Sequence, residues 1–245
     1  MIYLIVGASA GLGRSLSEKL ASVGHDLILV SSDHRDLEAI ASSLMIKYKV
    51  RVEIISAEIS SRSDYLDDIQ KIIKSMGGLD GIFCPVGAVS PVDNVCYNPN
   101  EMQYLTHVNY ISVVSVITRF WTLLTERPHH TIVIGFGSVA AIRGRNSNVV
   151  YSAAKRALMS FFESLRHTAA NSNVLVQFYI LGYLDTTLAF GRRTILPRAN
   201  LEILSQRIFD NLQKDFGVAF YPRYWYFITC ILEIIPWFLF KRLKF

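Results

Sequence analysis

Short apolar runs alternate along most of the chain with longer stretches in which apolar side chains recur every three or four residues. Short apolar runs bounded by turn residues predict buried strands, and the longer period predicts helices that cover them. The predicted strands are 1–6, 26–30, 50–56, 79–86, 131–135 and 174–180. The predicted helices are a stretch ending at Val23, then 36–48, 65–75, 101–124, 150–170 and 201–216.

This alternation predicts an α/β fold, a Rossmann-type doubly wound parallel sheet with helices on both faces. The 245 residues fit a single domain. Residues 1–200 are expected to form a dinucleotide-binding catalytic core. Residues 201–222 should supply a C-terminal helix that completes the core, and residues 223–245 form an apolar and basic tail.

The tail has its own composition. Residues 224–240 are apolar except for Thr229, Glu233 and Pro236, and cations follow them. This length is at the lower limit for a membrane span, whereas the tryptophan, tyrosine and cationic side chains suit a membrane interface. We therefore expect a peripheral or C-terminal anchor on the cytoplasmic face of the membrane. The alternative is a tail that packs on the body of the protein or on a partner subunit.

Composition narrows the functional classes. Hydrophobic residues make up 51% of the chain and charged residues 18%, which excludes a disordered protein. The net charge of +5 comes from scattered cations without a nucleic-acid-reading motif, so no nucleic-acid partner is expected. Cys84, Cys96 and Cys230 lack a C-x-x-C spacing and predict reduced, buried thiols and no metal site. No leader precedes the first strand, which favours a cytoplasmic catalytic body.

A glycine-rich turn follows the first strand directly and has the spacing G-x-x-x-G-x-G. Gly7 permits the sharp exit from the strand, Gly11 lets the backbone approach a diphosphate, and Gly13 lets the helix pack closely on the sheet. The amides at the start of the helix favour that anion. The predicted cofactor contacts in this turn are Gly7, Ser9, Ala10, Gly11, Leu12 and Gly13.

The residues after the second strand should decide which dinucleotide binds. An acid there accepts the ribose 2′-hydroxyl, whereas small or basic residues admit a 2′-phosphate. Ser31, Ser32 and Arg35 could form a phosphate pocket, so NADP(H) is favoured over NAD(H). Asp33 could turn inward and reverse this preference, although a solvated position or a helix cap is the favoured interpretation.

Tyr151 and Lys155 are four residues apart on a predicted helix, so their side chains share one face. A phenol with an ordinary pKa near ~10 needs a neighbouring cation to exchange a proton near neutral pH. Ser138, at the end of the fifth strand, could hold a substrate oxygen near the phenol. Asn109 is polar within an apolar helix and either bonds to the backbone or holds a water that relays protons to Lys155.

Together these residues resemble the short-chain dehydrogenase/reductase family over residues 1–190. The family's T-G-x-x-x-G-x-G corresponds to Val6–Gly13, and its Asn, Ser, Tyr, Lys tetrad falls on Asn109, Ser138, Tyr151 and Lys155. The resemblance implies further cofactor contacts at Glu58, Ile59, Gly87, Gly182 and Thr186. The family's N-N-A-G is Cys84-Pro85-Val86-Gly87 here, and its P-G is Leu181-Gly182, which leaves the fine geometry of the cofactor site open.

Within that family, the sequences around Asn109, before Tyr151 and in the tail resemble the decaprenylphosphoryl-2-keto-ribose reductases. This narrower resemblance implies a lipid-linked sugar substrate and a flavin oxidase as pathway partner. Four arginines in loops expected near the nicotinamide end could bind the substrate phosphate; the alternative is that they are exposed and solubilising. They are Arg143, Arg145, Arg192 and Arg193.

Three functions remain open from the sequence. The first is an NADP-dependent reductase of a lipid-linked keto-sugar in cell-envelope polysaccharide synthesis, and the second is a reductase of a soluble ketone. The third is a dinucleotide-binding sensor or scaffold without turnover, which the fold alone permits. By resemblance, a homo-oligomer is expected to form through helices 101–124 and 150–170.

Overall fold

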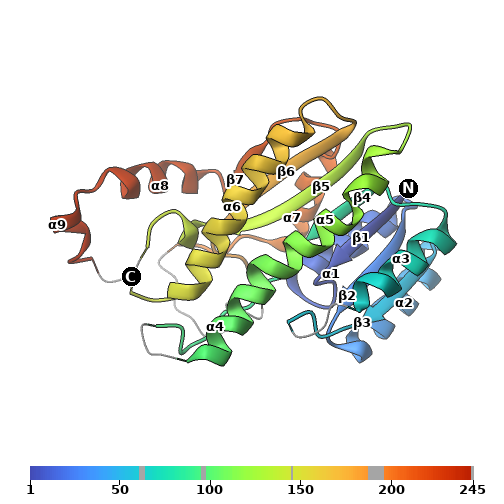
Figure 1. Cartoon of the computed structure of the whole chain (residues 1–245), viewed down its shortest axis with the longest axis horizontal. Helices are drawn as coiled ribbons and strands as arrows, with labels where there is room; N and C mark the ends of the chain where they lie inside the picture. The colour runs from blue at the N-terminus through green and yellow to red at the C-terminus, as the bar shows by residue number, and fades with distance from the viewer. Residues whose placement is uncertain (61–63, 95–97, 145, 187–195, 244–245) are drawn as a thin grey trace.

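The computed structural model describes residues 1–60, 64–94, 98–144, 146–186 and 196–243. Parallel strands form one sheet in the order β3-β2-β1-β4-β5-β6-β7 (Figure 1). The strands are β1 Ile2–Val6, β2 Asp26–Ser31, β3 Val52–Ser56, β4 Gly81–Cys84, β5 Thr131–Ser138, β6 Val174–Leu181 and β7 Val218–Tyr221. The order reverses direction between β1 and β4, and in such sheets ligands bind beyond the carboxyl ends of the strands at this point.

Helices cover both faces of the sheet. The main ones are α1 Gly11–Ser22, α2 His34–Tyr48, α3 Tyr65–Met76, α4 Pro99–Thr106, α5 Ser112–Thr125, α6 Val149–Ala169 and α7 Leu201–Asp210. Side chains of α1, α2 and α7 join the core on one face, and those of α3, α5 and α6 join the core on the other. Successive strand residues serve opposite cores: Leu4 and Val6 face one, and Tyr3 and Ile5 face the other. The predicted doubly wound parallel fold is therefore confirmed.

The sheet differs from the sequence prediction at its edge. Six strands were expected, whereas β7 adds a seventh beside β6. This strand has only four residues and lies between Gly217 and Pro222. Four residues are too few for an alternation of apolar and polar side chains to show in the sequence that a strand follows the helix. The helix α7 ends at Asp210, six residues before the predicted end, and the chain from there returns to the sheet.

The predicted helix 101–124 is one continuous helical stretch with a local change of pitch. A π-helical turn, η1 His107–Ile111, joins α4 to α5. The whole stretch Pro99–Thr125 is long and apolar enough to cross a membrane by length and composition, with 44% of its most apolar window buried. Val113, Val116 and Phe120 belong to the core beneath the sheet, so this helix packs as a core helix.

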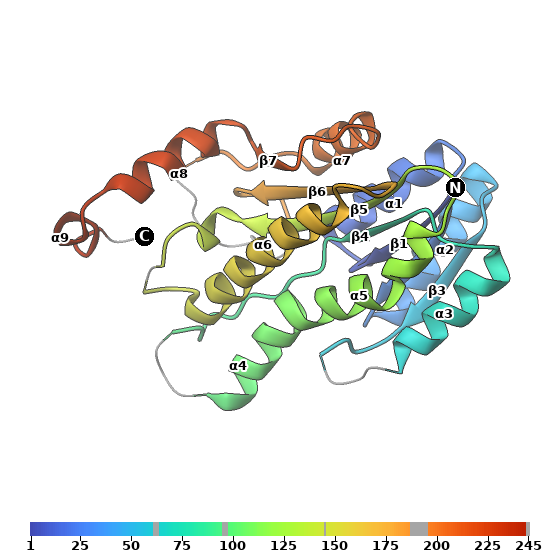
Figure 2. The ribbon, with the colours of Figure 1, turned by 45° about the horizontal axis from the view of Figure 1, so that its top comes forward.

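The tail forms two short helices, α8 Tyr224–Ile234 and α9 Trp237–Phe240, which extend away from the sheet on the side opposite to the N-terminus (Figures 1 and 2). Trp225 anchors the start of α8 and packs edge-to-face on Tyr183, with ring centroids 5.4 Å apart. Beyond it, large apolar side chains lie open to solvent; they include Phe227 (68% exposed), Ile234 (78%) and Trp237 (68%).

The cysteines fit the sequence interpretation only in part. Cys84 is a buried free thiol in β4, as expected. Cys230 is an exposed free thiol, so its predicted burial was wrong. Its apolar neighbours indicated a core position, but α8 projects from the body and exposes much of its surface. Cys96 lies outside the described residues.

Candidate active site

A cavity of about 550 Å³ opens at the carboxyl ends of the strands. The glycine turn after β1, the end of β2, the loops after β3, β4 and β6, the end of β5 and the start of α6 all line it. The predicted site residues that line it are Gly7, Ser9, Ala10, Gly11, Leu12, Ser31, Ser32, Glu58, Ile59, Gly87, Ser138, Tyr151, Lys155, Gly182 and Thr186. The fold thus brings residues from both halves of the chain into one space.

The glycine turn is too tight for side chains. Gly7 has a φ of +93°, and a Cβ there would lie 2.8 Å from the Cα of Val86. A Cβ on Gly13 would lie 1.9 Å from the carbonyl oxygen of Gly7, so α1 packs directly against the turn. Gly13 therefore lies beneath the cavity and is not among the described residues that line it. The first turn of α1 carries no acid, which leaves its amide end suited to a diphosphate.

At the end of β2, the wall of the cavity carries small polar side chains. The hydroxyl oxygens of Ser9 and Ser31 are 2.6 Å apart, and Ser32 lies beside them on the cavity wall. Asp33 caps α2, because its Oδ1 accepts from the amide of Asp36 at 3.1 Å. The favoured interpretation of Asp33 as a helix cap is confirmed. Arg35 is exposed on α2 and is not among the described residues that line the cavity, so its place in a phosphate pocket stays a prediction.

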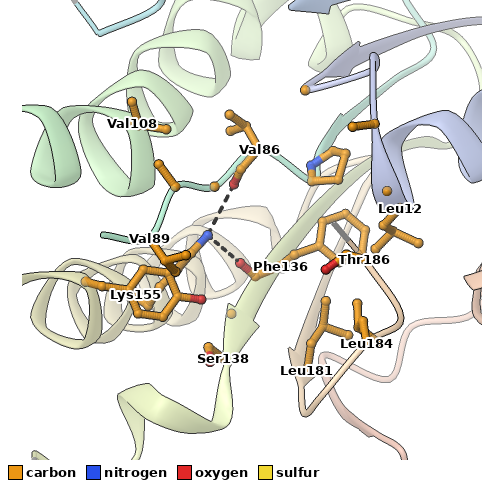
Figure 3. Close-up of a pocket in the computed structure, with 18 of the residues that line it drawn as sticks. Leu12, Val86, Val89, Val108, Phe136, Ser138, Lys155, Leu181, Leu184 and Thr186 are labelled. Carbon is orange, nitrogen blue, oxygen red and sulfur yellow. Dashed lines mark hydrogen bonds between the residues drawn. The ribbon is translucent and has the colours of Figure 1, made fainter. Parts of the chain in front are cut away.

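Lys155 is the buried cation of the site, with 4% of its surface exposed. Its Nζ donates to the carbonyl oxygens of Phe136 at 3.1 Å and Val86 at 3.3 Å (Figure 3). Burial lowers the pKa of Lys155 to about 8. Burial also raises the pKa of the Cys84 thiol to about 12, so this thiol is neutral when Lys155 titrates and supplies no counter-charge.

Tyr151 and Ser138 reach the cavity from neighbouring elements. Tyr151 is in the first turn of α6, one turn before Lys155, and is half-buried. Ser138 ends β5, and its hydroxyl accepts from the amide of Ala140 at 3.1 Å, which starts the short 3-10 helix η2 Val139–Ala141. Figure 3 shows Ser138 and Lys155 on one side of the cavity, facing Leu184 and Thr186 on the other. A substrate carbonyl between them would meet a phenol, a hydroxyl and a nearby cation.

Asn109 has a structural set of bonds. Its side chain is fully buried in the π-helical turn, donates to the carbonyl oxygens of Ala88 and Leu105 at 2.8 and 2.9 Å, and accepts from the amide of Ala88 at 3.1 Å. The structure therefore favours the backbone-bonding alternative for this side chain. Asn109 nevertheless lies close to Lys155, because a Cβ on Gly87 would touch Asn109 Oδ1 at 3.3 Å and Lys155 Nζ at 3.5 Å.

Of the four predicted substrate arginines, Arg143 lies within the described residues, and it is not among those that line the cavity. Arg143 donates to the carbonyl oxygen of Leu232, and its guanidinium lies 3.8 Å from the ring centroid of Phe240. The structure thus corrects the expectation for Arg143: it holds the tail, because its long side chain reaches the carboxyl end of α8. Arg145, Arg192 and Arg193 lie outside the described residues.

Sequence reasoning missed several residues of the wall. Val86, Ala88 and Val89 could have been found, because they follow β4 and loops after parallel strands face the ligand. Tyr104 and Val108 come from the helical stretch α4–η1, and only the tertiary packing brings them to the cavity. Asp93 was also missed: its buried carboxylate binds the first turn of α6.

Comparisons with known proteins agree with this site. The family model for short chain dehydrogenases matches residues 1–194. A hydroxysteroid 11-beta-dehydrogenase 1-like protein of Gallus gallus is 30% identical over 194 residues, which cover 77% of this chain and 66% of that protein. The chain therefore spans just under two thirds of that relative's length.

Solved structures share the fold. A short-chain dehydrogenase from Sphingobium yanoikuyae in complex with NADPH has a TM-score of 0.78 and 21% identity, with 99% of this chain and 96% of that chain covered. A short chain dehydrogenase/reductase from Burkholderia phymatum in complex with NAD has a TM-score of 0.82 and 18% identity, with 94% and 91% covered. The chain belongs to the short-chain dehydrogenase family and is an NAD(P)-dependent oxidoreductase with that family's single-domain α/β fold.

Proposed function

We propose that this enzyme reduces a carbonyl group to an alcohol, with Tyr151 as the proton donor. The observation that carries the proposal is that Tyr151, Ser138 and the buried Lys155 open into the same cavity as the glycine turn. A bound nicotinamide dinucleotide supplies the hydride for the carbonyl carbon. Tyr151 gives its hydroxyl proton to the carbonyl oxygen, so that one hydride and one proton convert the ketone into the alcohol.

Lys155 and Ser138 have separate tasks in this proposal. The positive charge of Lys155, four residues after Tyr151 on α6, favours the phenolate that remains after proton transfer. An ammonium group has three donors, and two described carbonyl groups accept from Lys155, which leaves one donor for a group in the cavity. Ser138 donates to the carbonyl oxygen and fixes its position before the transfer.

The cavity residues also fit the dinucleotide. The turn at Gly7 and Gly11 would hold the diphosphate, and Ser31 and Ser32 would hold the adenosine ribose. We favour NADP(H), because the carboxylate of Asp33 is turned to the α2 amides and does not oppose a 2′-phosphate with an inward-facing charge. Replacing Ser32 by Asp should shift the preference toward NADH. An unchanged ratio of activity with NADPH to activity with NADH in Ser32→Asp would contradict this assignment.

The substrate proposed is a lipid-linked keto-sugar at the cytoplasmic face of a membrane. Exposed apolar side chains on α8 and α9, with Lys241 and Arg242 beside them, suit the interface of a bilayer. Arg143 links this tail to the loop between β5 and α6, which also carries the cavity residues Ser147 and Asn148. The tail would thus bring the cavity to the plane in which a lipid-linked substrate lies.

The first experiment tests the chemistry. NADPH oxidation is measured with a polyprenyl-phosphoryl 2-keto-pentose and with a water-soluble ketone, for wild type and Tyr151→Phe. The expected loss for Tyr151→Phe is about 10²- to 10⁴-fold in kcat. Equal rates in both proteins contradict the role of Tyr151. Turnover of the soluble ketone alone supports the simpler reductase and removes the lipid-linked substrate.

The second experiment tests the tail. Vesicles of anionic phospholipid should sediment with the full chain, and replacement of Phe227, Ile231 and Trp237 by Ser should abolish this binding. Binding that survives these changes contradicts the interfacial anchor. The flavin oxidase partner and the homo-oligomer remain predictions, and light scattering of the purified chain tests the second of them.

A further inference from the structure

A buried carboxylate outside the family's tetrad is attached to the helix that carries Tyr151. Asp93 lies in the loop after β4, and only 6% of its surface is exposed. Its Oδ1 accepts from the amide of Val150 at 2.8 Å, and its Oδ2 accepts from the amide of Tyr151 at 2.9 Å. Its own carbonyl oxygen accepts from the amide of Asn148 at 3.0 Å. Three bonds therefore join this one residue to the start of α6.

The start of α6 needs such a partner. Its N-cap residue, Asn148, has a left-handed backbone with a φ of 56° and makes no side-chain capping bond, and its first turn carries no acid. Unpaired amides at a helix start favour an anion, and charge-assisted bonds to a carboxylate are about twice as strong as neutral ones. Asp93 supplies the anion and the charge-assisted bonds from a position more than fifty residues earlier in the sequence.

The same contact joins two walls of the cavity. The loop after β4 contributes Val86 and Val89 to the lining, and the segment before α6 contributes Ser147 and Asn148. The carbonyl oxygen of Val86 also accepts from Lys155, so that loop touches α6 at two points one helical turn apart. The backbone of Tyr151 is therefore fixed relative to the loop that also orients Lys155.

We propose that Asp93 is a positioning residue that holds the backbone of Tyr151 so that its hydroxyl meets the substrate carbonyl. This inference rests on the proposed role of Tyr151 as proton donor. Asp93 is not among the described residues that line the cavity, so it acts through α6 and leaves the dinucleotide site unchanged. A displacement of a catalytic group by about 1 Å can cost about 10²-fold in rate, which sets the scale of the expected effect.

The test compares Asp93→Ala and Asp93→Asn with wild type in the full chain. Asp93→Ala should lower kcat about 10- to 100-fold, with the KM for the ketone and the Kd for NADPH changed less than about threefold. The solvent deuterium isotope effect on kcat should increase, because proton transfer from a misplaced phenol becomes slower. Asp93→Asn keeps the size of the side chain and one acceptor oxygen, so its kcat and isotope effect should lie between those of wild type and Asp93→Ala.

Asn98→Ala is the matched control. Asn98 caps α4 by accepting from the amide of Glu101 at 3.2 Å, so its removal also deletes a bond at a helix start. This variant should keep kcat and the isotope effect of wild type. Circular dichroism melting and NADPH titration establish that each variant is folded; if Asp93→Ala does not fold, Asp93→Asn gives the result.

The outcomes separate two failures. If Asp93→Asn keeps the kcat and isotope effect of wild type, or changes them no more than Asn98→Ala does, the positioning role is wrong. A parallel rise in the Kd for NADPH shows general loosening of the fold and also overturns it. If Tyr151→Phe itself keeps wild-type activity, the proposed function is wrong, whatever Asp93 does.

Discussion

Each end of the sheet holds a buried charged side chain, but only the one at the amino end is paired with an opposite charge in the described structure. At the amino end, Asp80 before β4 is 3% exposed and accepts from the amide of Ile2 at 2.7 Å and from Arg127 Nε at 2.8 Å. The Nε2 atom of His129 lies 2.9 Å from the same carboxylate. At the carboxyl end, Lys155 is equally buried, and its partners in the described structure are two neutral carbonyl groups.

The pKa values follow from this difference. Burial alone would raise the pKa of Asp80, but the bonds from Ile2, Arg127 and His129 outweigh it and hold the pKa below its ordinary value. Burial lowers the pKa of Lys155 to about 8, because no opposing charge compensates it. Asp80, whose charge serves the fold, is paired, whereas Lys155, which we propose serves proton transfer, has a pKa near neutral pH.

Lys155→Met should show the largest effect. It removes the cation that favours the phenolate of Tyr151, so kcat/KM for ketone reduction should fall about 10³-fold. The fold should survive, because the variant removes a buried charge that has no counter-charge. Lys71→Met is the control, since Lys71 pairs with Asp68 on the surface. Steady-state assays that find Lys155→Met within tenfold of wild type would remove Lys155 from the mechanism.

Asp80→Ala should affect stability and leave the chemistry unchanged. Removing the buried carboxylate leaves the amide of Ile2 without its acceptor and the partly exposed charge of Arg127 without its partner, which should lower the free energy of unfolding by about 3 kcal/mol. Asp68→Ala breaks only an exposed pair and should cost less than about 1 kcal/mol. Urea unfolding measures both, and kcat should stay that of wild type. Equal stability losses in the two variants would show that the Asp80 pairing contributes nothing beyond a surface pair.

The two charges should act in different pH ranges. The pKa of Asp80 is lower in the folded than in the unfolded chain, so its stabilisation is present above about pH 4 and is lost as pH falls toward the folded pKa. The pKa of Lys155 is also lower when folded, so stability should rise by about 3 kcal/mol between pH 8 and 10.5. Urea unfolding across pH, compared with Asp80→Ala and Lys155→Met, isolates each part. An alkaline rise that persists in Lys155→Met contradicts the assignment.

Arg143→Ala should have the smallest effect, and it tests whether this arginine belongs to the substrate site. Its loss removes the bond to Leu232 and the contact with the ring of Phe240, which should cost about 1 kcal/mol. Turnover of a water-soluble ketone should stay within about twofold of wild type. A tenfold rise in KM for that ketone would instead place Arg143 at the substrate.

The sequence predicts those parts of the site whose geometry is local. Gly7, Gly11 and Gly13 follow a strand directly, and Tyr151 and Lys155 are one helical turn apart, so spacing alone brings each group together. The common edge of parallel strands then brings the glycine turn and Ser138 to one cavity.

Contacts between distant segments could not be predicted in this way. Asp93 binds α6 across more than fifty residues, and Arg143 reaches α8 across about ninety. Nothing in the local pattern distinguishes these side chains from solvated ones, because their partners are backbone groups that every residue carries. The exposure of Cys230 was also missed, because it depends on how far α8 lies from the body.

The pKa of Lys155 tests the central claim most directly. In protein labelled with ¹³C at lysine Cε, the Lys155 signal is assigned by its absence in Lys155→Met and followed by NMR between pH 6 and 11. The structure predicts a midpoint at about pH 8, well below the ordinary value of a solvated lysine. A midpoint above about pH 10 would mean that Lys155 is solvated or paired, and would contradict the contrast between the two ends of the sheet.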